Sequence, residues 1–338
     1  MICYGASNMP RNKPSPAGKA TGTATRGRMP AKARPTPRRP LSGRRRPTQR
    51  RQWLWVVGLL AAVVLAVGAW IASRSGGEAG SGAAPFVGGD LHSMVVDPGD
   101  PNRLWAGGHG GAAASIDGGR TWTQIPSLDG ADPMGWEIDP KNPSRHYLGG
   151  HPGFRVSTDG GRSFTMRNRG LPATDVHGLG RDPASGRLYA AVVGRGLLAS
   201  DDQGATWTVV NPAVQTMGPI LVDPKDPRTL YLSDMHNLIR STDGGRSWQR
   251  LGAIPGAMWI ARSADGSTFL AAAGGQPLKS TDAGRTFAPT GPPPTAVAAV
   301  AFANRTGRRL YAAGLDGERA VVFRSDDGGA RWQPTIPG

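Results

Sequence analysis

The chain has 338 residues, with 40 Lys or Arg against 24 Asp or Glu and a formal net charge of +16 at pH 7. Residues 1–52 hold 14 of these basic residues and no acidic one, so the rest of the chain is nearly neutral. This charge distribution argues against nucleic acid as a partner of the folded part, because such binding uses a broad basic surface. The single cysteine, Cys3, excludes an intrachain disulfide.

The N-terminal quarter predicts a tail and a membrane anchor. Residues 1–52 are rich in Pro, Gly and Thr and cannot bury a core, which predicts a disordered basic tail. Residues 53–72 carry no charge and predict one transmembrane helix, because 20 residues rising about 1.5 Å each cover a hydrocarbon core roughly 30 Å thick. By the positive-inside rule we expect a single-pass protein of the cell membrane, with a cytoplasmic N-terminus and everything after the anchor extracytoplasmic.

Two other interpretations of this segment stay open. The order of residues 50–54, Arg-Arg-Gln-Trp-Leu, resembles a twin-arginine export signal, and the apolar stretch could be a cleaved secretory signal. Its length, and Trp70 near the place where cleavage needs small residues, favour a retained signal anchor. Residues 73–86 are rich in Gly, Ser and Ala and predict a flexible linker.

Residues 87–338 contain six copies of one eight-residue pattern, Ser-x-Asp-x-Gly-x-(Thr/Ser)-(Trp/Phe), which we call the box. The boxes begin at Ser115, Ser157, Ser200, Ser241, Ser280 and Ser325. Successive boxes start 39 to 45 residues apart, a period at which four short strands fill each repeat and the repeats close into a ring. The predicted fold class is therefore all-β, a six-bladed β-propeller whose boxes join the third and fourth strands of each blade. The sixth box departs from the pattern, with Arg331 in place of the hydroxyl residue.

The boxes are interpreted as structural elements. Their Ser and Asp side chains can bond backbone groups of a tight turn, Gly supplies the positive φ of that turn, and the aromatic residue packs against the sheet. The predicted structural aspartates are Asp117, Asp159, Asp202, Asp243, Asp282 and Asp327. Each box offers too few oxygen ligands for calcium, so we expect no metal there and predict no cofactor.

The repeats resemble the Asp-box (bacterial neuraminidase repeat, BNR) propellers, a group that includes sialidases, xyloglucanase-type glycoside hydrolases, the sortilin ectodomain and photosystem II assembly factors. The resemblance covers about residues 90–338 and implies the fold, but its members do unrelated jobs. Residues 97–111 look like a bacterial subgroup labelled glycosylhydrolases. Sialidase chemistry, as the resemblance implies it, needs a Tyr–Glu nucleophile pair, three arginines and an acid/base Asp. Here the propeller tyrosines recur at one strand position and predict packing residues: Tyr147, Tyr189, Tyr231 and Tyr311.

Residues that break the repeat are the better functional candidates. With the boxes at the bottom of the ring, the loops between second and third strands and the connections between blades form the opposite face, which we call the top face. The predicted ligand-binding residues of this face are His92, His109, His151, His177, His236, Arg195, Glu318 and Trp259. His146 lies elsewhere in the repeat. The available top-face acids are Asp132, Asp175, Asp234 and Glu318, of which Asp175 is the candidate catalytic acid and Asp234 the candidate base.

Two functions from different classes follow. The favoured one is a membrane-anchored, extracytoplasmic module that binds a protein or glycan through the top face. The alternative is a cell-surface glycoside hydrolase of the sialidase or glycosylhydrolase type, using Asp175 and Asp234. Metal-dependent sensing through the histidines is the third and least favoured, because strand-start and loop histidines can equally satisfy backbone carbonyls. Ring closure is expected either from packing or from residues 85–89 adding an edge.

Overall fold

The computed structural model describes residues 84–293, 295–303 and 306–336. The predicted tail (1–52), the predicted transmembrane helix (53–72) and the linker up to residue 83 lie outside the described residues. Within these ranges no helix is both long and apolar enough to cross a bilayer.

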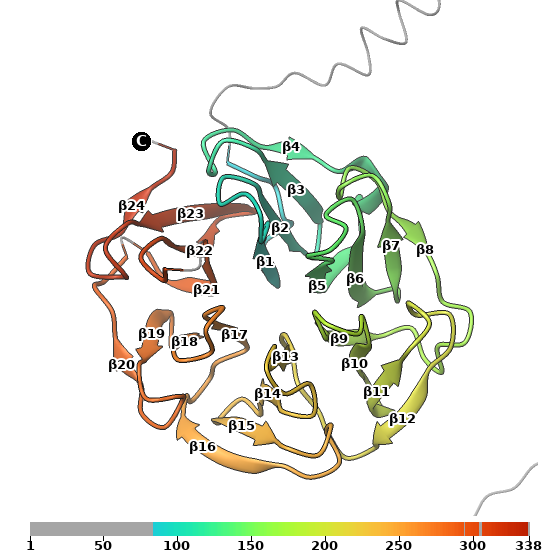
Figure 1. The fold of residues 1–338 in the computed structure, drawn as a ribbon. Coiled ribbons are helices and arrows are strands. Elements are labelled where there is room, and N and C mark those ends of the chain that lie inside the picture. The colour runs from blue at the N-terminus through green and yellow to red at the C-terminus, as the bar shows by residue number, and fades with distance from the viewer. Residues whose placement is uncertain (1–83, 294, 304–305, 337–338) are drawn as a thin grey trace, which may run out of the picture. The chain divides into compact units, whose positions relative to one another are not determined.

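Six four-stranded antiparallel sheets form a ring, which confirms the predicted all-β, six-bladed propeller (Figure 1). In every sheet the strands pair in sequence order, and the first strand lines the central channel. The inner strands are β1 (Ser93–Val96), β5 (Asp132–Ile138), β9 (Val176–Arg181), β13 (Leu221–Val222), β17 (Trp259–Arg262) and β21 (Val297–Phe302). The second strands are β2 (Leu104–Gly108), β6 (His146–His151), β10 (Leu188–Val192), β14 (Leu230–Ser233), β18 (Phe269–Ala273) and β22 (Leu310–Asp316).

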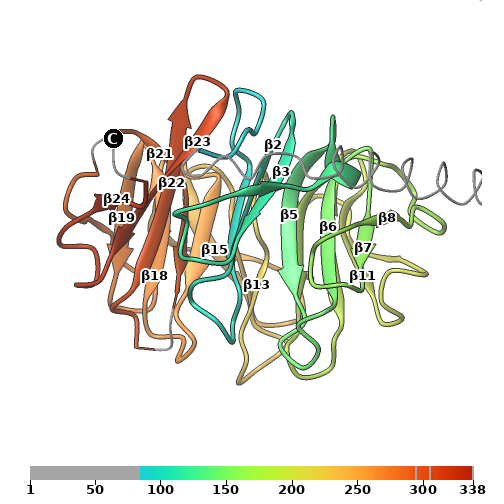
Figure 2. The same ribbon diagram turned by 90° about the horizontal axis from the view of Figure 1, so that it is seen from above.

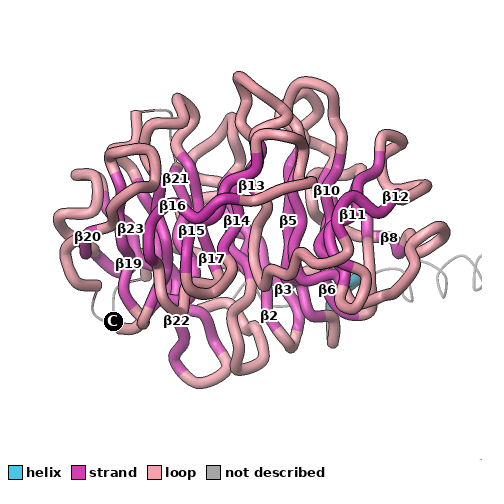
Figure 3. The backbone as a smooth tube through the Cα atoms, turned by 90° about the horizontal axis from the view of Figure 1, so that it is seen from below, coloured by secondary structure: helices cyan, strands magenta, loops and turns pink. Residues whose placement is uncertain are grey.

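The outer half of each blade consists of the third and fourth strands. The third strands are β3 (Gly111–Ser115), β7 (Arg155–Ser157), β11 (Gly196–Ser200), β15 (Asn237–Ser241), β19 (Gln276–Ser280) and β23 (Arg319–Ser325). The outer strands are β4 (Thr123–Gln124), β8 (Thr165–Met166), β12 (Thr208–Asn211), β16 (Gln249–Ala253), β20 (Ala288–Pro289) and β24 (Gln333–Pro334). One short 3₁₀ turn, η1 (Pro126–Leu128), connects the first blade to the second. The strands run between two loop-bearing faces, seen from the side in Figures 2 and 3.

The first box shows why this eight-residue pattern makes a tight turn. The Ser115 hydroxyl donates to Asp117 Oδ1 at 2.9 Å and accepts the Gly119 N–H at 2.9 Å. The backbone N–H and the hydroxyl of Thr121 both donate to the Asp117 carboxylate, at 2.9 and 2.7 Å. The Trp122 indole donates to the Gly119 carbonyl at 2.9 Å, which holds the ring against the turn. Each residue type that recurs in the boxes therefore has a hydrogen-bonding or packing role.

The other boxes repeat the Ser–Asp part of this network. Across the six, the Ser hydroxyl lies 2.7 to 2.9 Å from its Asp Oδ1. In the third box, hydrogen bonds from Thr206 and then Ser200 lower the pKa of Asp202 to about 2. In the sixth box Arg331 replaces the hydroxyl, and its Nε donates to Asp327 Oδ2 at 3.2 Å. A guanidinium thus substitutes for the missing hydroxyl donor.

Apolar and aromatic side chains pack between neighbouring blades. Trp105 of β2 and Trp136 of β5 have ring centroids 6.3 Å apart, with His146 between blades at 4.7 Å from Trp105. His146 Nδ1 accepts the Trp136 indole N–H at 3.2 Å, so its Nε2 is the nitrogen that donates to the Pro143 carbonyl at 3.1 Å. Burial lowers the pKa of His146 to about 4. The predicted packing tyrosines are all buried: Tyr147, Tyr189, Tyr231 and Tyr311.

Ring closure uses the segment that precedes the first blade. Residues 85–89 pass between the top loops of the first and sixth blades. The Val87 N–H donates to the Glu318 carbonyl at 2.9 Å, and the Val87 carbonyl accepts the Gly110 N–H at 2.8 Å. Phe86 and Arg319 form a bridge of the antiparallel type. The segment therefore ties the first blade to the last.

Packing closes the same junction. Leu104 and Leu310, from β2 and β22, belong to one buried cluster that spans the junction. Thr335, just after β24, donates its hydroxyl to the Gly119 carbonyl of the first box at 2.8 Å. Of the two closure modes that the sequence left open, both are present.

Candidate functional site

The predicted site residues gather at the end of the ring opposite the boxes. His109 follows β2 and His236 lies between β14 and β15, while His151 ends β6; all three are exposed. Arg195 and Glu318, in the loops before β11 and β23, are also exposed. The antiparallel blades put these loops at one end and the boxes at the other. The top face thus presents several polar side chains to solvent.

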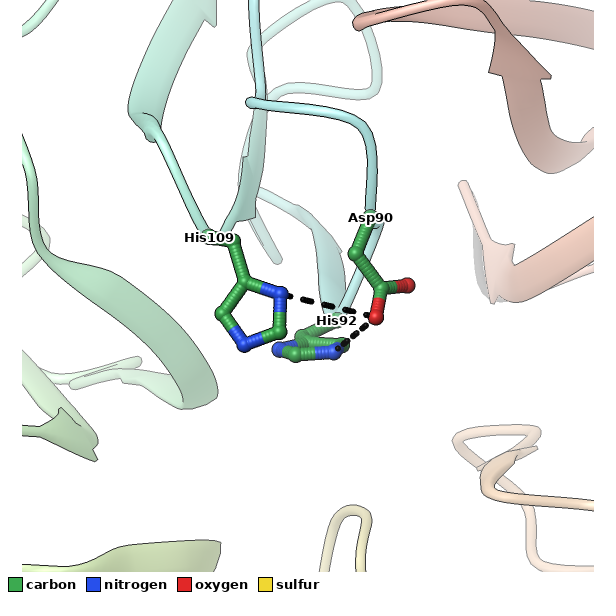
Figure 4. A group of neighbouring side chains, drawn as sticks. All are labelled: Asp90, His92 and His109. Carbon is green, nitrogen blue, oxygen red and sulfur yellow. Dashed lines mark ion pairs between the residues drawn. The ribbon is translucent and has the colours of Figure 1, made fainter.

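Four side chains at the top of the first two blades form one cluster of carboxylate–imidazole pairs. Figure 4 shows Asp90, His92 and His109 turned toward one another. His92 Nε2 lies 2.9 Å and His109 Nδ1 lies 3.6 Å from the same oxygen, Asp90 Oδ2. The other ring nitrogens face Asp132: His92 Nδ1 is 2.6 Å from Oδ1, and His109 Nε2 is 3.1 Å from Oδ2. We call these four residues the Asp–His cluster.

The two imidazoles differ in exposure and in electrostatic setting. The His92 side chain is 10% exposed, whereas that of His109 is 57% exposed. Burial by itself would lower the pKa of His92, but hydrogen bonds and charges from Asp132 and Asp90 outweigh it and raise the pKa. The imidazole ring centroids lie 4.6 Å apart in an edge-to-face arrangement. The cluster therefore combines a fixed inner imidazole with an accessible outer one.

Backbone geometry determines where Asp90 lies. A Cβ on Gly108, at the end of β2, would lie 1.7 Å from the Asp90 carbonyl oxygen, so only glycine allows the two segments to pass this closely. Asp90 also accepts the backbone N–H of Leu91 on Oδ1 at 2.9 Å, which leaves Oδ2 for the histidines. The closing segment 85–89 leads directly into this position. The cluster thus depends on the ring junction as well as on the first blade.

The cluster has a partial copy in the third blade. His177 Nε2 lies 2.9 Å from Asp175 Oδ1, and these two residues have the same spacing in the sequence as Asp90 and His92. In both blades the Asp lies seven residues, and the His five residues, before the Asp of an Asp-Pro turn. No histidine follows β10 as His109 follows β2, since Val193, Gly194 and Arg195 fill that loop. The second blade has His151 at the end of β6 but Met134 five residues before its turn. The complete set is assembled by the first blade, with Asp132 added from the second.

The two predicted catalytic acids have different environments. Asp175 pairs with His177, as above. Asp234 instead stabilises its own loop: Oδ1 accepts the backbone N–H groups of His236 at 3.0 Å and Asn237 at 2.6 Å. Burial alone would raise the pKa of Asp234, but these hydrogen bonds outweigh it and lower the pKa. A carboxylate held ionised in this way is poorly suited to donate a proton but is compatible with the predicted role of base.

One predicted top-face residue is corrected by the structure. Trp259 is 5% exposed, and its indole donates to the Val300 carbonyl of β21 at 2.9 Å. The apolar ring fills the space between the inner strands of the fifth and sixth blades and satisfies its one donor there. Trp259 is a packing residue, not part of the top surface.

Two features of the structure were not predicted from the sequence. Asp90 was not singled out, although the pattern Asp-x-His at residues 90–92, repeated at 175–177, was visible in the sequence. A cavity of about 300 Å³ lies at the bottom end of the channel, lined in part by Glu137, Arg181 and Arg262. Burial raises the pKa of Glu137 to about 8, while the charge of Arg181 opposes this. The sequence signal for this buried carboxyl group was an acidic residue within an inner strand.

Each arginine of this bottom cavity is held by a carboxylate of the preceding blade. Arg181 Nη2 lies 3.0 Å from Asp139 Oδ1, and Arg262 Nη2 lies 2.8 Å from Asp223 Oδ2. The Arg262 guanidinium also covers the Tyr231 ring at 4.9 Å. These arginines therefore form ion pairs that join neighbouring blades.

The chain matches no protein-family model and no curated protein. Solved structures share its fold. A GH74 xyloglucanase from Xanthomonas campestris is 21% identical with a TM-score of 0.53, over 75% of this chain and 46% of its own. A protein of unknown function from Bacteroides thetaiotaomicron VPI-5482 is 12% identical with a TM-score of 0.57, over 72% and 70%. A chain of a nidogen/laminin complex is 14% identical with a TM-score of 0.55, over 70% and 93%.

These similarities establish a shared propeller architecture. The chain spans less than half the length of the GH74 enzymes that it matches. Structural similarity at such low identity carries the fold and not the activity, because one fold supports many functions.

Proposed function

We propose that this chain is a membrane-anchored, extracytoplasmic propeller that binds a protein or glycan ligand through its top face. The observation that carries the proposal is the Asp–His cluster, where donors and acceptors converge beside solvent. The side chains of Asp90 and His109 are 46% and 57% exposed, so a ligand can reach them. Convergent polar groups of this kind fix the orientation of a bound ligand.

Asp234 is already engaged within its own loop, where its Oδ1 accepts two backbone N–H groups, and this supports a structural role for its carboxylate. Hydrolysis of this type needs a carboxylic acid that keeps its proton until the leaving oxygen takes it. The lowered pKa keeps Asp234 ionised, so in a hydrolase this role would fall to Asp175. Similar propellers occur both in a xyloglucanase and in a nidogen/laminin complex, so the fold by itself leaves both functions open.

The membrane anchor is proposed from the sequence. Residues 53–72 carry no charge, and the preceding basic tail favours a cytoplasmic N-terminus. We expect the full-length protein in the membrane fraction of its host, with the propeller cleaved from intact cells by added protease. Recovery in the soluble fraction would contradict this part of the proposal.

Site-specific photocrosslinking tests the binding surface. A photoreactive residue at Arg195 samples the top face, and one at Ile116, which is 75% exposed in the first box, samples the bottom as a matched control. We expect crosslinks to one defined ligand from position 195 and none from position 116. The reverse pattern would refute top-face binding.

A parallel assay tests the hydrolase alternative. The full-length protein is incubated with polysaccharides and sialosides, and released sugars are detected by mass spectrometry. We expect no release. Release that is abolished in an Asp175→Asn/Asp234→Asn variant would make the protein a glycoside hydrolase.

A further inference from the structure

We propose that Asp90, His92 and His109 bind one divalent transition-metal ion, with zinc as the expected ion, at the top of the first blade. Their ligand atoms all lie within 4.8 Å of one another. No metal was predicted from the sequence, where metal-dependent sensing through the histidines was the least favoured function and Asp90 was not among the candidate residues. The proposal does not rest on the proposed function, since it concerns the metal alone.

The interatomic distances match the space that one ion requires. Zinc binds imidazole nitrogen and carboxylate oxygen at about 2.0–2.2 Å, which separates neighbouring ligands of a tetrahedron by about 3.3–3.5 Å. His92 Nε2 and His109 Nδ1 lie 2.9 and 3.6 Å from Asp90 Oδ2, on either side of that value. An ion therefore fits after small side-chain adjustments, and it takes the place of the proton that His92 shares with Asp90.

Asp132 supplies the outer support that metal-binding histidines use. Such histidines donate their second ring N–H to a carboxylate or carbonyl, which fixes the tautomer and the ring orientation. Asp132 contacts the second nitrogen of both rings, with His92 Nδ1 at 2.6 Å and His109 Nε2 at 3.1 Å. One carboxylate thereby turns His92 Nε2 and His109 Nδ1 toward Asp90. The Asp132 side chain is only 12% exposed.

The donor set identifies the class of ion. Two imidazoles and one carboxylate suit zinc and its transition-metal neighbours, whereas calcium and magnesium prefer oxygen ligands. Three protein ligands leave at least one coordination position for water or for an oxygen atom of a ligand, as in open zinc sites. Because His109 and Asp90 face solvent, that position opens on the top face.

The blades provide internal controls. Asp175 and His177 reproduce the Asp90–His92 pair without a third ligand, and His151 reproduces the position of His109 without the pair. Neither copy offers three converging ligand atoms. Changes at these copies therefore separate the metal site from general effects of removing a top-face histidine.

The test is a zinc titration of full-length protein purified without a polyhistidine tag and stripped with a chelator. Isothermal titration calorimetry gives the affinity, and elemental mass spectrometry gives the bound zinc per chain. We expect one zinc per chain. His109→Ala, at an exposed position, should lower the affinity more than about 100-fold, since it removes a ligand, and Asp132→Asn should lower it about 10- to 100-fold. His151→Ala should leave the zinc affinity unchanged.

Circular dichroism confirms that each variant is folded. Absence of stoichiometric zinc in the wild-type protein would overturn the proposal. Equal zinc affinity in the wild-type protein and the folded His109→Ala variant would also overturn it, because the ion would then bind elsewhere.

Discussion

Glu137 offers a quantitative test of the interior of the propeller. Its carboxyl group lines the bottom cavity beside Arg181, and its pKa is raised from an ordinary 4.5 to about 8. We predict that Glu137→Gln stabilises the protein at pH 9 and has little effect at pH 4.5. Glutamine keeps the size of the side chain and resembles the protonated form, so the variant removes the titration and little else.

The sign and size follow from proton linkage. Between pH 4.5 and pH 8 the folded protein holds a proton on Glu137 that the unfolded chain releases, so stability falls as the pH rises through this window and levels off above it. A full shift of this size corresponds to about 4–5 kcal/mol at about 1.4 kcal/mol per pH unit. Because the side chain is partly accessible from the cavity, we expect about half of this, roughly 2 kcal/mol, or about 4–8 °C in Tm for a domain of this size.

The assay is thermal unfolding of both proteins from pH 4.5 to pH 9, monitored by circular dichroism. Other titrating groups act equally in both proteins, so the difference in Tm isolates Glu137. We expect the difference to be near zero at pH 4.5 and to grow in favour of Glu137→Gln above neutral pH. Parallel Tm curves at all pH values would refute the reasoning.

Three further predictions follow from the structure. Burial lowers the pKa of His146 from 6.5 to about 4, so the contribution of neutral His146 to stability is fully present above pH 6.5 and is lost as the pH falls toward 4. His146→Gln should flatten this acid limb of the curve of Tm against pH, and an unchanged limb would contradict the assignment. Ser200→Ala leaves the Gly204 N–H without its acceptor and should lower the free energy of unfolding by about 1–3 kcal/mol, measured by denaturant unfolding. No measurable loss would show that the box does not stabilise the fold. Gly108→Ala places a Cβ 1.7 Å from the Asp90 carbonyl oxygen and should displace Asp90; zinc affinity equal to that of the wild-type protein would contradict the geometry.

The propeller could be predicted because its determinants are local and repeated. The Ser, Asp and Gly of each box act within eight residues, so their spacing in the sequence reports the turn directly. The sequence showed that Arg331 replaces the hydroxyl residue of the sixth box. It did not show that the Arg331 guanidinium donates to Asp327 instead, because this contact depends on side-chain geometry. The placement of loop histidines on one face followed from strand counting alone.

Contacts between blades could not be predicted in the same way. Trp259 was expected on the surface, but its position depends on the facing strand that carries Val300. The Asp–His cluster depends on Asp132, which lies 40 residues from His92 in the sequence. The raised pKa of Glu137 results from its surroundings in the folded ring. Strand patterning gives no information about such long-range neighbours.

The central structural claim is that Asp90, His92 and His109 converge into one site on the top face. The most direct measurement is a crystal structure of the zinc-loaded, full-length protein, with anomalous diffraction recorded on both sides of the zinc absorption edge. We predict an anomalous peak about 2.0–2.2 Å from Asp90 Oδ2, His92 Nε2 and His109 Nδ1. Imidazoles that point away from Asp90, or a zinc peak only at another position, would contradict the claim.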